Sequence, residues 1–278
     1  MRTSIHVTTK DRATEVSLLL TSLRSQTYQD WDIIILDDGS GTPLGQFSFF
    51  ISLTSQLKLE GHKVKVLRND QSQGVCNARN FLIESDDFDN PLTCRLDDDI
   101  VLKEDYLARL VDVVEAGYGI ATGVVPLLGV PELVRESERV GEIVCRHELD
   151  KEGSLVLRND ELAYCYDLAQ VLPCDQFRTN ALYKSEIHKV ARYPDCLTPV
   201  GFREELWFSF KALIAGYTIG ADLGAKCWHL RTPSGGVRRD NYRECVLQDE
   251  ETTNRWVKEM YLKHGNFLEK NHKRGEVA

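Results

Sequence analysis

Apolar and polar positions follow two different rhythms along the first 125 residues. Short runs that are apolar almost throughout predict strands at 4–8, 31–36, 64–67, 93–96 and 119–125. Between these runs, apolar residues recur at helical spacing and predict helices at 14–23, 43–60, 75–84 and 104–116. Strands that are apolar on both faces and alternate with helices indicate a mainly parallel sheet covered on both sides. We therefore predict an α/β fold with a Rossmann-like layout.

The pattern changes after residue 126. Residues 127–172 are polar and mixed, and they indicate only hairpins and a loop. Regular patterning then returns and predicts strands near 180–183, 218–221 and 225–228 and helices near 185–191, 204–215 and 252–262. We predict one domain over 1–240, with a first half at about 1–126 and a second at about 127–240. A helical C-terminal tail follows at 241–278.

Charge narrows the classes of partner. The chain has a net charge of −9 and an isoelectric point near 5.4. Non-specific nucleic-acid binding depends on Lys and Arg neutralising phosphates, so this charge argues against a nucleic-acid partner. An acidic protein that handles an anionic substrate usually recruits a cation, which favours a metal site.

Cysteine spacing and hydropathy bear on the location of the chain. The N-terminus lacks the apolar stretch of a secretion signal, and no run approaches the 18 apolar residues of a membrane span. Eight cysteines are scattered without a C-x-x-C pair, several of them inside predicted strands. We therefore expect a cytoplasmic protein with reduced core thiols, no membrane span and no structural zinc.

Three consecutive carboxylates, Asp97, Asp98 and Asp99, follow the predicted strand at 93–96. In open α/β sheets, ligands bind at the carboxyl ends of the strands. Adjacent carboxylates repel one another, and a divalent cation that also binds phosphate oxygens would offset their charge. The alternative is a solvated acidic turn that caps the next helix. On these residues alone, both remain open.

Two further segments end predicted strands. Residues 9–12 precede a helix whose N-terminal N–H groups suit a phosphate, and Lys10 or Arg12 would add charge. The alternative there is an N-cap turn with Asp11 as the cap. The sequence D-D-G-S at 37–40 offers carboxylates to ribose or base edges, or forms an ordinary Asp-Gly turn.

Three later segments also carry candidate chemistry. In G-V-C-N-A-R-N at 74–80, Arg79 could contact a pyrophosphate or the acidic triplet, or pair with an acidic neighbour on the surface. Glu204 and Glu205 open a helix, whose dipole alone would favour acidic residues. His229 ends the last core strand, before a Gly-Gly segment with three arginines that begins at Arg231.

Together and in this order, the segments resemble a family 2 glycosyltransferase of the GT-A fold over about residues 4–230. The D-D-G-S and G-x-x-x-A-R-N motifs of that family are present verbatim at 37–40 and 74–80, and its D-x-D corresponds to Asp97-Asp98-Asp99. Its late acidic pair, before a helix that ends in A-G-Y, corresponds to Glu204-Glu205 and residues 215–217. The family usually has Glu-Asp at this pair, so Glu205 is one methylene longer.

The resemblance implies inverting transfer of a sugar from a nucleotide-diphosphate sugar, with UDP as the expected nucleotide, to an acceptor hydroxyl. The nucleotide would bind the half at 1–126 and the acceptor the half at 127–240. One-step displacement needs a neutralised leaving group and a general base. The resemblance assigns the base to Glu205 or Glu204 and a Mn²⁺ or Mg²⁺ ion to Asp97, Asp99 and His229. The nucleotide-sugar-binding residues that it implies are Thr9, Asp11, Arg12, Asp37, Asp38, Gly74, Arg79, Asp97, Asp98 and Arg231.

Two other functions remain open at this point. A sugar-1-phosphate nucleotidyltransferase is also α/β and metal-dependent, but it should carry a Gly-rich loop after the first strand, and residues 9–12 contain no glycine. A non-catalytic glycan- or nucleotide-binding module would have no need of both acidic sets. Neither the sugar nor the acceptor is identified by any motif, and residues 127–178 carry none.

Overall fold

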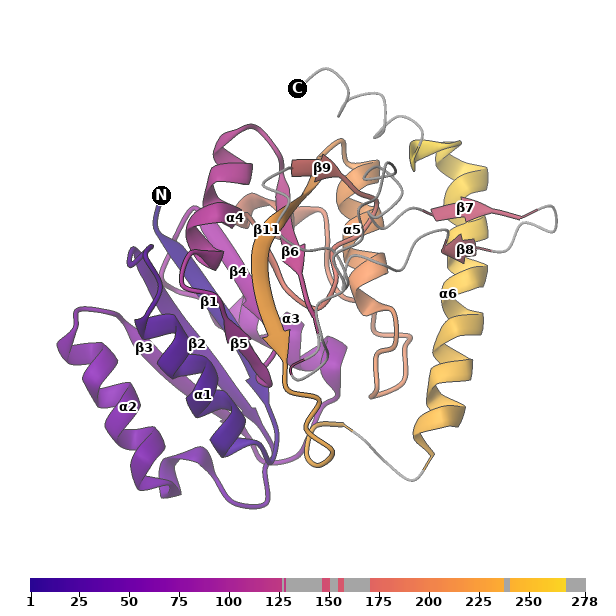
Figure 1. Cartoon of the computed structure of the whole chain (residues 1–278). Coiled ribbons are helices and arrows are strands. Elements are labelled where there is room, and N and C mark those ends of the chain that lie inside the picture. The colour runs from indigo at the N-terminus through magenta and orange to yellow at the C-terminus, as the bar shows by residue number, and fades with distance from the viewer. Residues whose placement is uncertain (127, 129–146, 151–154, 158–170, 238–240, 269–278) are drawn as a thin grey trace.

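The structure is a computed structural model that describes residues 1–126, 128, 147–150, 155–157, 171–237 and 241–268. Within these residues, nine strands form a curled sheet with helices on both faces (Figure 1). The order along the sheet is β3 (Val64–Asn69), β2 (Trp31–Asp38), β1 (Thr3–Thr9), β4 (Leu92–Leu96), β10 (Ala181–Lys184), β6 (Ile120–Val124), β11 (Ile219–His229) and β5 (Ile100–Leu102), with β9 (Val171–Pro173) paired to β11. The predicted α/β fold is confirmed.

The four strands β3, β2, β1 and β4 run parallel to one another. Parallel neighbours need crossover connections, and α1 (Ala13–Arg24), α2 (Ser48–Leu59) and α3 (Val75–Ser85) lie in these connections. The second helix begins at residue 48 rather than 43. A 3₁₀ turn, η1 (Leu44–Gln46), precedes it, and the first amide of this turn donates to the Asp37 carboxylate at 3.2 Å.

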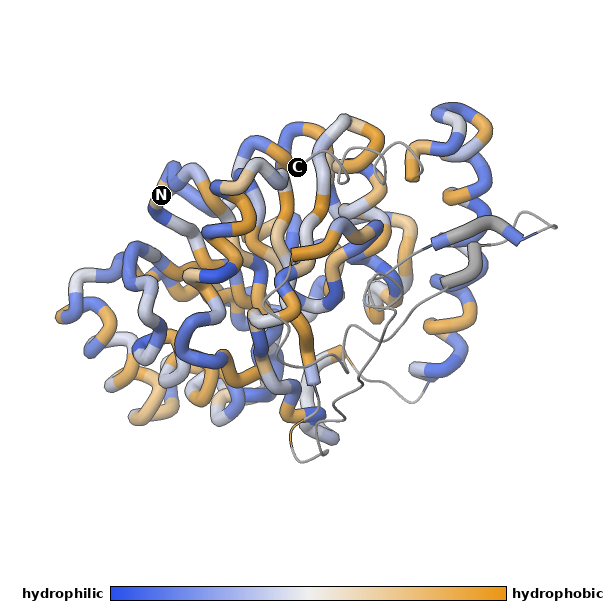
Figure 2. The backbone as a smooth tube through the Cα atoms, turned by 45° about the horizontal axis from the view of Figure 1, so that its top comes forward, coloured by the Kyte–Doolittle hydropathy of each residue, from blue (hydrophilic) through white to orange (hydrophobic). Residues whose placement is uncertain are grey.

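Alternate residues of β2 face opposite layers. Ile33 and Ile35 belong to the core shared with α1, α2 and α4 (Tyr106–Glu115), whereas Ile34 and Leu36 pack on the α3 side. A strand buried on both faces needs an apolar side chain at nearly every position, which explains the continuous apolar run in its sequence. Figure 2 shows hydrophobic positions along the strands of the sheet.

The other half of the sheet mixes strand directions. β10 is antiparallel to β4 and β6, and β11 is parallel to β6 but antiparallel to β5 and β9. The strands predicted near 218–221 and 225–228 are the single strand β11, whose register on β6 shifts between Ala221 and Lys226. At this irregularity the Gly224 amide donates to the Asp222 carboxylate at 2.7 Å. The polar residues of the bulge therefore interrupt the apolar pattern without ending the strand.

Helices α5 (Glu204–Ile214) and α6 (Tyr242–His264) pack on each other beside this half. The indoles of Trp207 and Trp256 stack with centroids 4.0 Å apart, and Trp207 Nε1–H donates to Thr253 Oγ1 at 2.9 Å. α6 begins at Tyr242 and not at the predicted residue 252, because the polar residues at 248–251 interrupt the apolar spacing from which the helix was predicted. The helix predicted at 185–191 is a 3₁₀ helix, η4 (Ser185–Lys189).

Most of the segment at 127–172 lies outside the described residues, as do Cys145 and Cys165. Two strands from it, β7 (His147–Leu149) and β8 (Leu155–Leu157), pair antiparallel, in agreement with a hairpin. Of the six described cysteines, five are buried thiols and Cys196 is an exposed one. No helix among the described residues combines the length and apolar character needed to cross a membrane.

Candidate functional site

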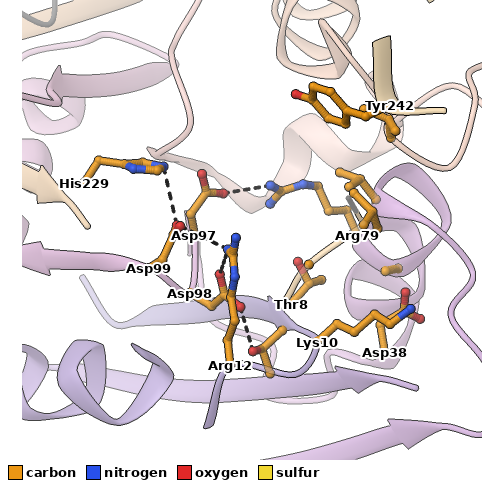
Figure 3. Close-up of a pocket in the computed structure, with 16 residues that line it drawn as sticks. Thr8, Lys10, Arg12, Asp38, Arg79, Asp97, Asp98, Asp99, His229 and Tyr242 are labelled. Carbon is orange, nitrogen blue, oxygen red and sulfur yellow. Dashed lines mark hydrogen bonds and ion pairs between the residues drawn. The ribbon is translucent and has the colours of Figure 1, made fainter. Parts of the chain in front are cut away.

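A cavity of about 270 Å³ lies where the parallel strands end (Figure 3). It is bounded by the carboxyl ends of β1, β2 and β4, by the start of α3 and by the end of β11. The residues with a predicted role that line it are Thr9, Arg12, Asp38, Arg79, Asp97, Asp98, Asp99 and His229. The structure therefore brings together side chains that are up to 220 positions apart in the sequence.

Each carboxylate of the acidic triplet contacts an arginine. Asp97 accepts from Arg79 at 2.8 Å, and Arg12 Nη1 lies 2.9 Å from an Asp98 oxygen and 3.0 Å from an Asp99 oxygen. Thr9 Oγ1 also donates to Asp98 at 2.7 Å. The triplet thus has cationic partners within the chain, and its repulsion alone does not require a metal.

The net shift in pKa differs between the first two carboxylates of the triplet. Burial raises the pKa of Asp98 to about 6, although Arg12 and Thr9 act against this shift. Burial also acts to raise the pKa of Asp97, but the positive charges of Arg79 and Arg95 outweigh it, so the pKa falls below its ordinary value. Asp97 is therefore the carboxylate of this pair that is held ionised.

Asp97, Asp99 and His229 could together hold a metal ion. One ligand atom from each residue lies within 4.8 Å of the others, and His229 Nε2 is 3.5 Å from an Asp99 oxygen. Two carboxylates and an imidazole suit a first-row transition ion. His229 Nδ1 accepts the Arg231 amide at 2.9 Å, so a neutral ring would carry its proton on Nε2. Ligation through Nε2 would therefore require this hydrogen bond to open.

The two aspartates of D-D-G-S have different surroundings. Asp38 lines the cavity and accepts from Asn69, Ser72 and the Gln73 amide. Asp37 lies outside the lining, and its carboxylate accepts from two backbone amides of its own loop and from Arg68. The contacts of Asp37 thus fix the loop after β2.

Asp11, Gly74 and Arg231 also lie outside the cavity lining, at backbone turns. Asp11 has a φ of +54°, and its amide and carboxylate bond to residues 40 and 41. Gly74 has a φ of +81° at the N-terminus of α3, where an added Cβ would lie 2.7 Å from Pro199 Cα. The alternative in which Asp11 caps α1 is wrong, because Arg12 occupies the N-cap position.

The glutamate pair lies beside the cavity rather than in its lining. Glu204 is 3% exposed and forms a two-pronged ion pair with Arg95, at 2.5 and 3.0 Å, while Arg79 Nε lies 3.3 Å away. Burial raises the pKa of Glu204 to about 7 against the pull of Arg95. The Glu205 side chain is 22% exposed and touches Arg95 with one oxygen at 3.4 Å. The two glutamates thus differ in access to solvent.

Sequence reasoning missed several participants. Arg95 stands in the middle of a buried strand, with its guanidinium over the rings of Phe177 and Tyr193 at 5.2 and 5.6 Å. An arginine inside an otherwise apolar run was the available signal, because a buried charge needs a partner. Val200 and Tyr242 line the cavity from segments without a recognisable motif.

The segment after β11 lies against the turn that follows β1. The Gly236 amide donates to the Lys10 carbonyl at 2.8 Å, and Arg12 Nε donates to the Ser234 carbonyl at 3.1 Å. A Cβ at Gly235 would lie 2.6 Å from Arg12 Cγ, so this approach requires glycine. Lys10 and Gly236 both line the cavity, which this contact helps to close.

Comparison with solved structures gives the same fold. The structure of GalNAc-T7 with UDP, GalNAc and Mn²⁺ matches with a TM-score of 0.70 at 14% identity, over 94% of this chain and 49% of that one. Residues 1–349 of S. aureus TarS in complex with UDP-GlcNAc match with a TM-score of 0.57 at 16% identity, over 88% of this chain and 64% of that one. This chain therefore spans about half to two thirds of the length of these structural relatives.

The sequence itself gives the family. No curated protein matches the chain. The family model described as "Glycosyl transferase family 2" matches residues 4–151, a range that contains the turn after β1, both glycine-containing motifs and the acidic triplet. This match covers more than half of the chain, and the fold agrees with it. The chain belongs to glycosyl transferase family 2 and has the GT-A fold.

Proposed function

We propose that the chain transfers a sugar from a UDP-sugar to an acceptor hydroxyl, with inversion at the anomeric carbon. The observation that carries this proposal is the position of Arg79. Its Nη2 lies 2.8 Å from Asp97, and its Nε lies 3.3 Å from Glu204. One side chain therefore joins the candidate metal donors to the glutamate pair, and a donor and an acceptor could meet between them.

Glu205 is the better candidate for the general base. Both carboxylate oxygens of Glu204 are held by Arg95, and the side chain is buried. Glu205 is partly exposed and has one oxygen near Arg95. A base must reach the acceptor proton and have a free lone pair, which favours Glu205. Glu204 would then act as the counter-ion that holds Arg95 and Arg79 in place.

The proposed step is a single displacement. The acceptor oxygen forms a bond to the anomeric carbon while its proton passes to the Glu205 carboxylate. The bond between the anomeric carbon and the β-phosphate oxygen breaks, and UDP leaves with that electron pair. Attack from the face opposite the leaving group inverts the anomeric configuration.

The leaving diphosphate needs positive charge near it. Asp97, Asp99 and His229 would hold a Mn²⁺ or Mg²⁺ ion, which would supply that charge when bound; the imidazole favours Mn²⁺. Arg12 and Lys10 face the same cavity and could also contact phosphate oxygens. Asp38, in the cavity wall, suits hydrogen bonding to the nucleoside. The nucleotide-sugar-binding roles of Asp11, Asp37, Gly74 and Arg231 stay predictions. These four residues lie outside the cavity lining.

UDP is proposed because the similar structures of GalNAc-T7 and TarS contain UDP or UDP-GlcNAc. The exposure of Glu205 favours an enzyme over a binding module, which would not need a base. The acceptor is proposed only as a hydroxyl-bearing molecule. The cytoplasmic location, and the division at residues 126 and 240, stay predictions.

Calorimetry of UDP binding with and without Mn²⁺ tests the donor side, and UDP release from UDP-GlcNAc and UDP-GalNAc tests turnover. We expect Mn²⁺ to tighten UDP binding to the wild type and Asp99→Ala to remove this gain. Asp112→Ala, which deletes an exposed carboxylate on α4, is the matched control and should behave like the wild type. Equal Mn²⁺-dependent affinity in Asp99→Ala and the control would exclude the proposed metal site.

A further inference from the structure

Residues 198–203 lead directly into the glutamate pair and adopt an uncommon backbone. Gly201 and Arg203 have φ values of +64° and +67°, and Arg203 occupies the N-cap position of α5. A left-handed conformation is unfavourable for a side chain such as that of Arg203. Surrounding contacts must therefore hold this segment in place, and they also set the direction in which α5 begins.

On one side, the segment rests on the N-terminus of α3. The Pro199 carbonyl accepts the Val75 amide at 3.0 Å, and Gly74 leaves just enough room for Pro199. Val200 extends from the same turn into the cavity wall. The segment therefore connects the cavity to the glutamate pair.

On the other side, the segment is held by α6. Asp249 is fully buried, and its two oxygens accept three hydrogen bonds from the segment. The donors are the Thr198 amide at 2.6 Å, the Thr198 hydroxyl at 2.9 Å and the Phe202 amide at 2.8 Å. The next residue, Glu250, pairs with Arg203 at 2.8 Å. Consecutive acidic residues of α6 thus bind both ends of the turn.

The helix that supplies these contacts is itself fixed. One turn beyond Asp249, Thr253 accepts the Trp207 indole N–H, and Trp256 stacks on the same indole. The first residue of α6, Tyr242, lines the cavity. α6 therefore touches the cavity, the turn and α5 along its length, as Figure 1 also shows for its path beside α5.

We propose that Asp249 is a positioning residue, which fixes Glu205 through the turn at 198–203, and that α6 is part of the site. This inference rests on the proposed function only for its kinetic consequence. The structural consequence, an ordered turn, holds whatever the chain catalyses. Asp249 does not touch the cavity and is assigned no contact with substrate.

The test compares two pairs of variants. Asp249→Asn places an NH₂ group against at least one of the three donors, whereas Glu251→Gln removes the same charge from the exposed face of α6. Thr198→Val removes one hydroxyl without changing the shape of the side chain, and Thr198→Ser keeps the hydroxyl. Thr198→Val also serves where Asp249→Asn fails to fold.

Hydrogen–deuterium exchange is the readout that does not depend on activity. We expect faster exchange in peptides covering 196–206 for Asp249→Asn and Thr198→Val, with unchanged exchange in β2 and β4. UDP release from a UDP-sugar into water, with Mn²⁺, is the kinetic readout. We expect kcat to fall about 10- to 100-fold in Asp249→Asn and about 5-fold in Thr198→Val. KM for the donor should stay within about 2-fold, and Thr198→Ser should restore kcat.

The two readouts separate the two proposals. If wild type neither binds UDP nor releases it, the proposed function fails, and the exchange result alone decides whether Asp249 orders the turn. If exchange at 196–206 is the same in Asp249→Asn, Thr198→Val and Glu251→Gln, the positioning role is wrong. The positioning role is also wrong if kcat falls by the same factor in Thr198→Ser as in Thr198→Val.

Discussion

The two halves of the sheet build their parts of the site in different ways. In the parallel half, the candidate hydroxyl and carboxylate side chains of the cavity lie where strands end, as Thr9 does on β1, Asp38 on β2 and Asp97 after β4. In the mixed half, Glu204 and Glu205 depend on Arg95 from the parallel half and on a turn held by α6. Strand order alone brings the first set together, whereas the second set requires pairing between distant segments.

The halves also differ in how they treat a carboxylate beside an arginine. Asp97 is paired with Arg79 at the cavity and has a 20% exposed side chain, whereas Glu204 is 3% exposed and paired with Arg95. Asp97 lines the cavity, where a metal or a ligand could replace Arg79 as its partner. Glu204 lies outside the cavity lining, and loss of Arg95 would leave its buried charge without its main compensation. The Asp97–Arg79 pair is therefore suited to binding, and the Glu204–Arg95 pair to holding the site together.

The largest expected effect separates the two glutamates. Glu205→Gln keeps the shape of the side chain but removes the proton acceptor. We expect turnover to fall by roughly 10²- to 10⁴-fold, the usual scale of general-base catalysis, with UDP affinity unchanged. Steady-state rates of UDP release and calorimetry check this. If Glu204→Gln reduces turnover by that factor and Glu205→Gln does not, the base is Glu204 and its ion pair must open during catalysis.

A second prediction contrasts a buried arginine that holds Glu204 with a partly exposed arginine that holds Asp37. Arg95→Met leaves Glu204 buried with Arg79 as its remaining arginine, and we expect the free energy of unfolding to fall by about 3–5 kcal/mol. Arg68→Met removes a partly exposed partner of Asp37, whose backbone donors remain, so we expect a loss of about 1 kcal/mol or less. Urea unfolding at constant pH measures both. Similar losses for the two variants would remove the distinction between the buried Glu204–Arg95 pair and the partly exposed Asp37–Arg68 pair.

The same contrast explains how far the sequence could predict the site. The apolar runs at 31–36 and 93–96 mark buried strands, so the acidic residues that follow them could be located at the sheet edge from the sequence alone. The internal partners of Asp37 could not, because whether a carboxylate bonds its own loop or a ligand depends on side-chain geometry. Asp249 lies in a polar stretch without apolar periodicity. Its contact with Thr198, 51 positions earlier, has no local signal.

The fold shows a similar division. The four parallel strands and their crossover helices were predicted because each is long enough to show a clear pattern. The strands are nearly continuous apolar runs, and the helices have apolar residues at helical spacing. The three-residue strands β5 and β9 are too short to show a period, and the bulge in β11 divides one strand into two apparent ones. Antiparallel insertion of β10 between β4 and β6 is a matter of topology, which hydrophobic spacing does not encode.

A third prediction concerns the contact between the halves at Gly74. Gly74→Ala adds a Cβ at a φ of +81° and 2.7 Å from Pro199 Cα, both of which are unfavourable. We expect the free energy of unfolding to fall by roughly 1–3 kcal/mol and exchange at 196–206 to rise. Gly45→Ala, where no atom lies within 4 Å of the added Cβ, is the matched control. An unchanged stability and exchange pattern in Gly74→Ala would mean that the turn is not clamped there.

The smallest expected effect concerns pH and the buried glutamate. Burial raises the pKa of Glu204 to about 7, so the folded state binds a proton more tightly than the unfolded chain does. Stability from this group is therefore present at low pH and is lost as pH rises from about 4.5 towards about 7. Between about pH 5 and about pH 7, we expect wild type to lose on the order of 1 kcal/mol more unfolding free energy than Glu204→Gln loses.

Both proteins are unfolded with urea in the presence of a chelator, and the contributions of Asp98 and the histidines cancel in the difference. Identical pH dependence in the two proteins would mean that Arg95 keeps Glu204 ionised throughout this range, and that the buried pair acts as a permanent ion pair.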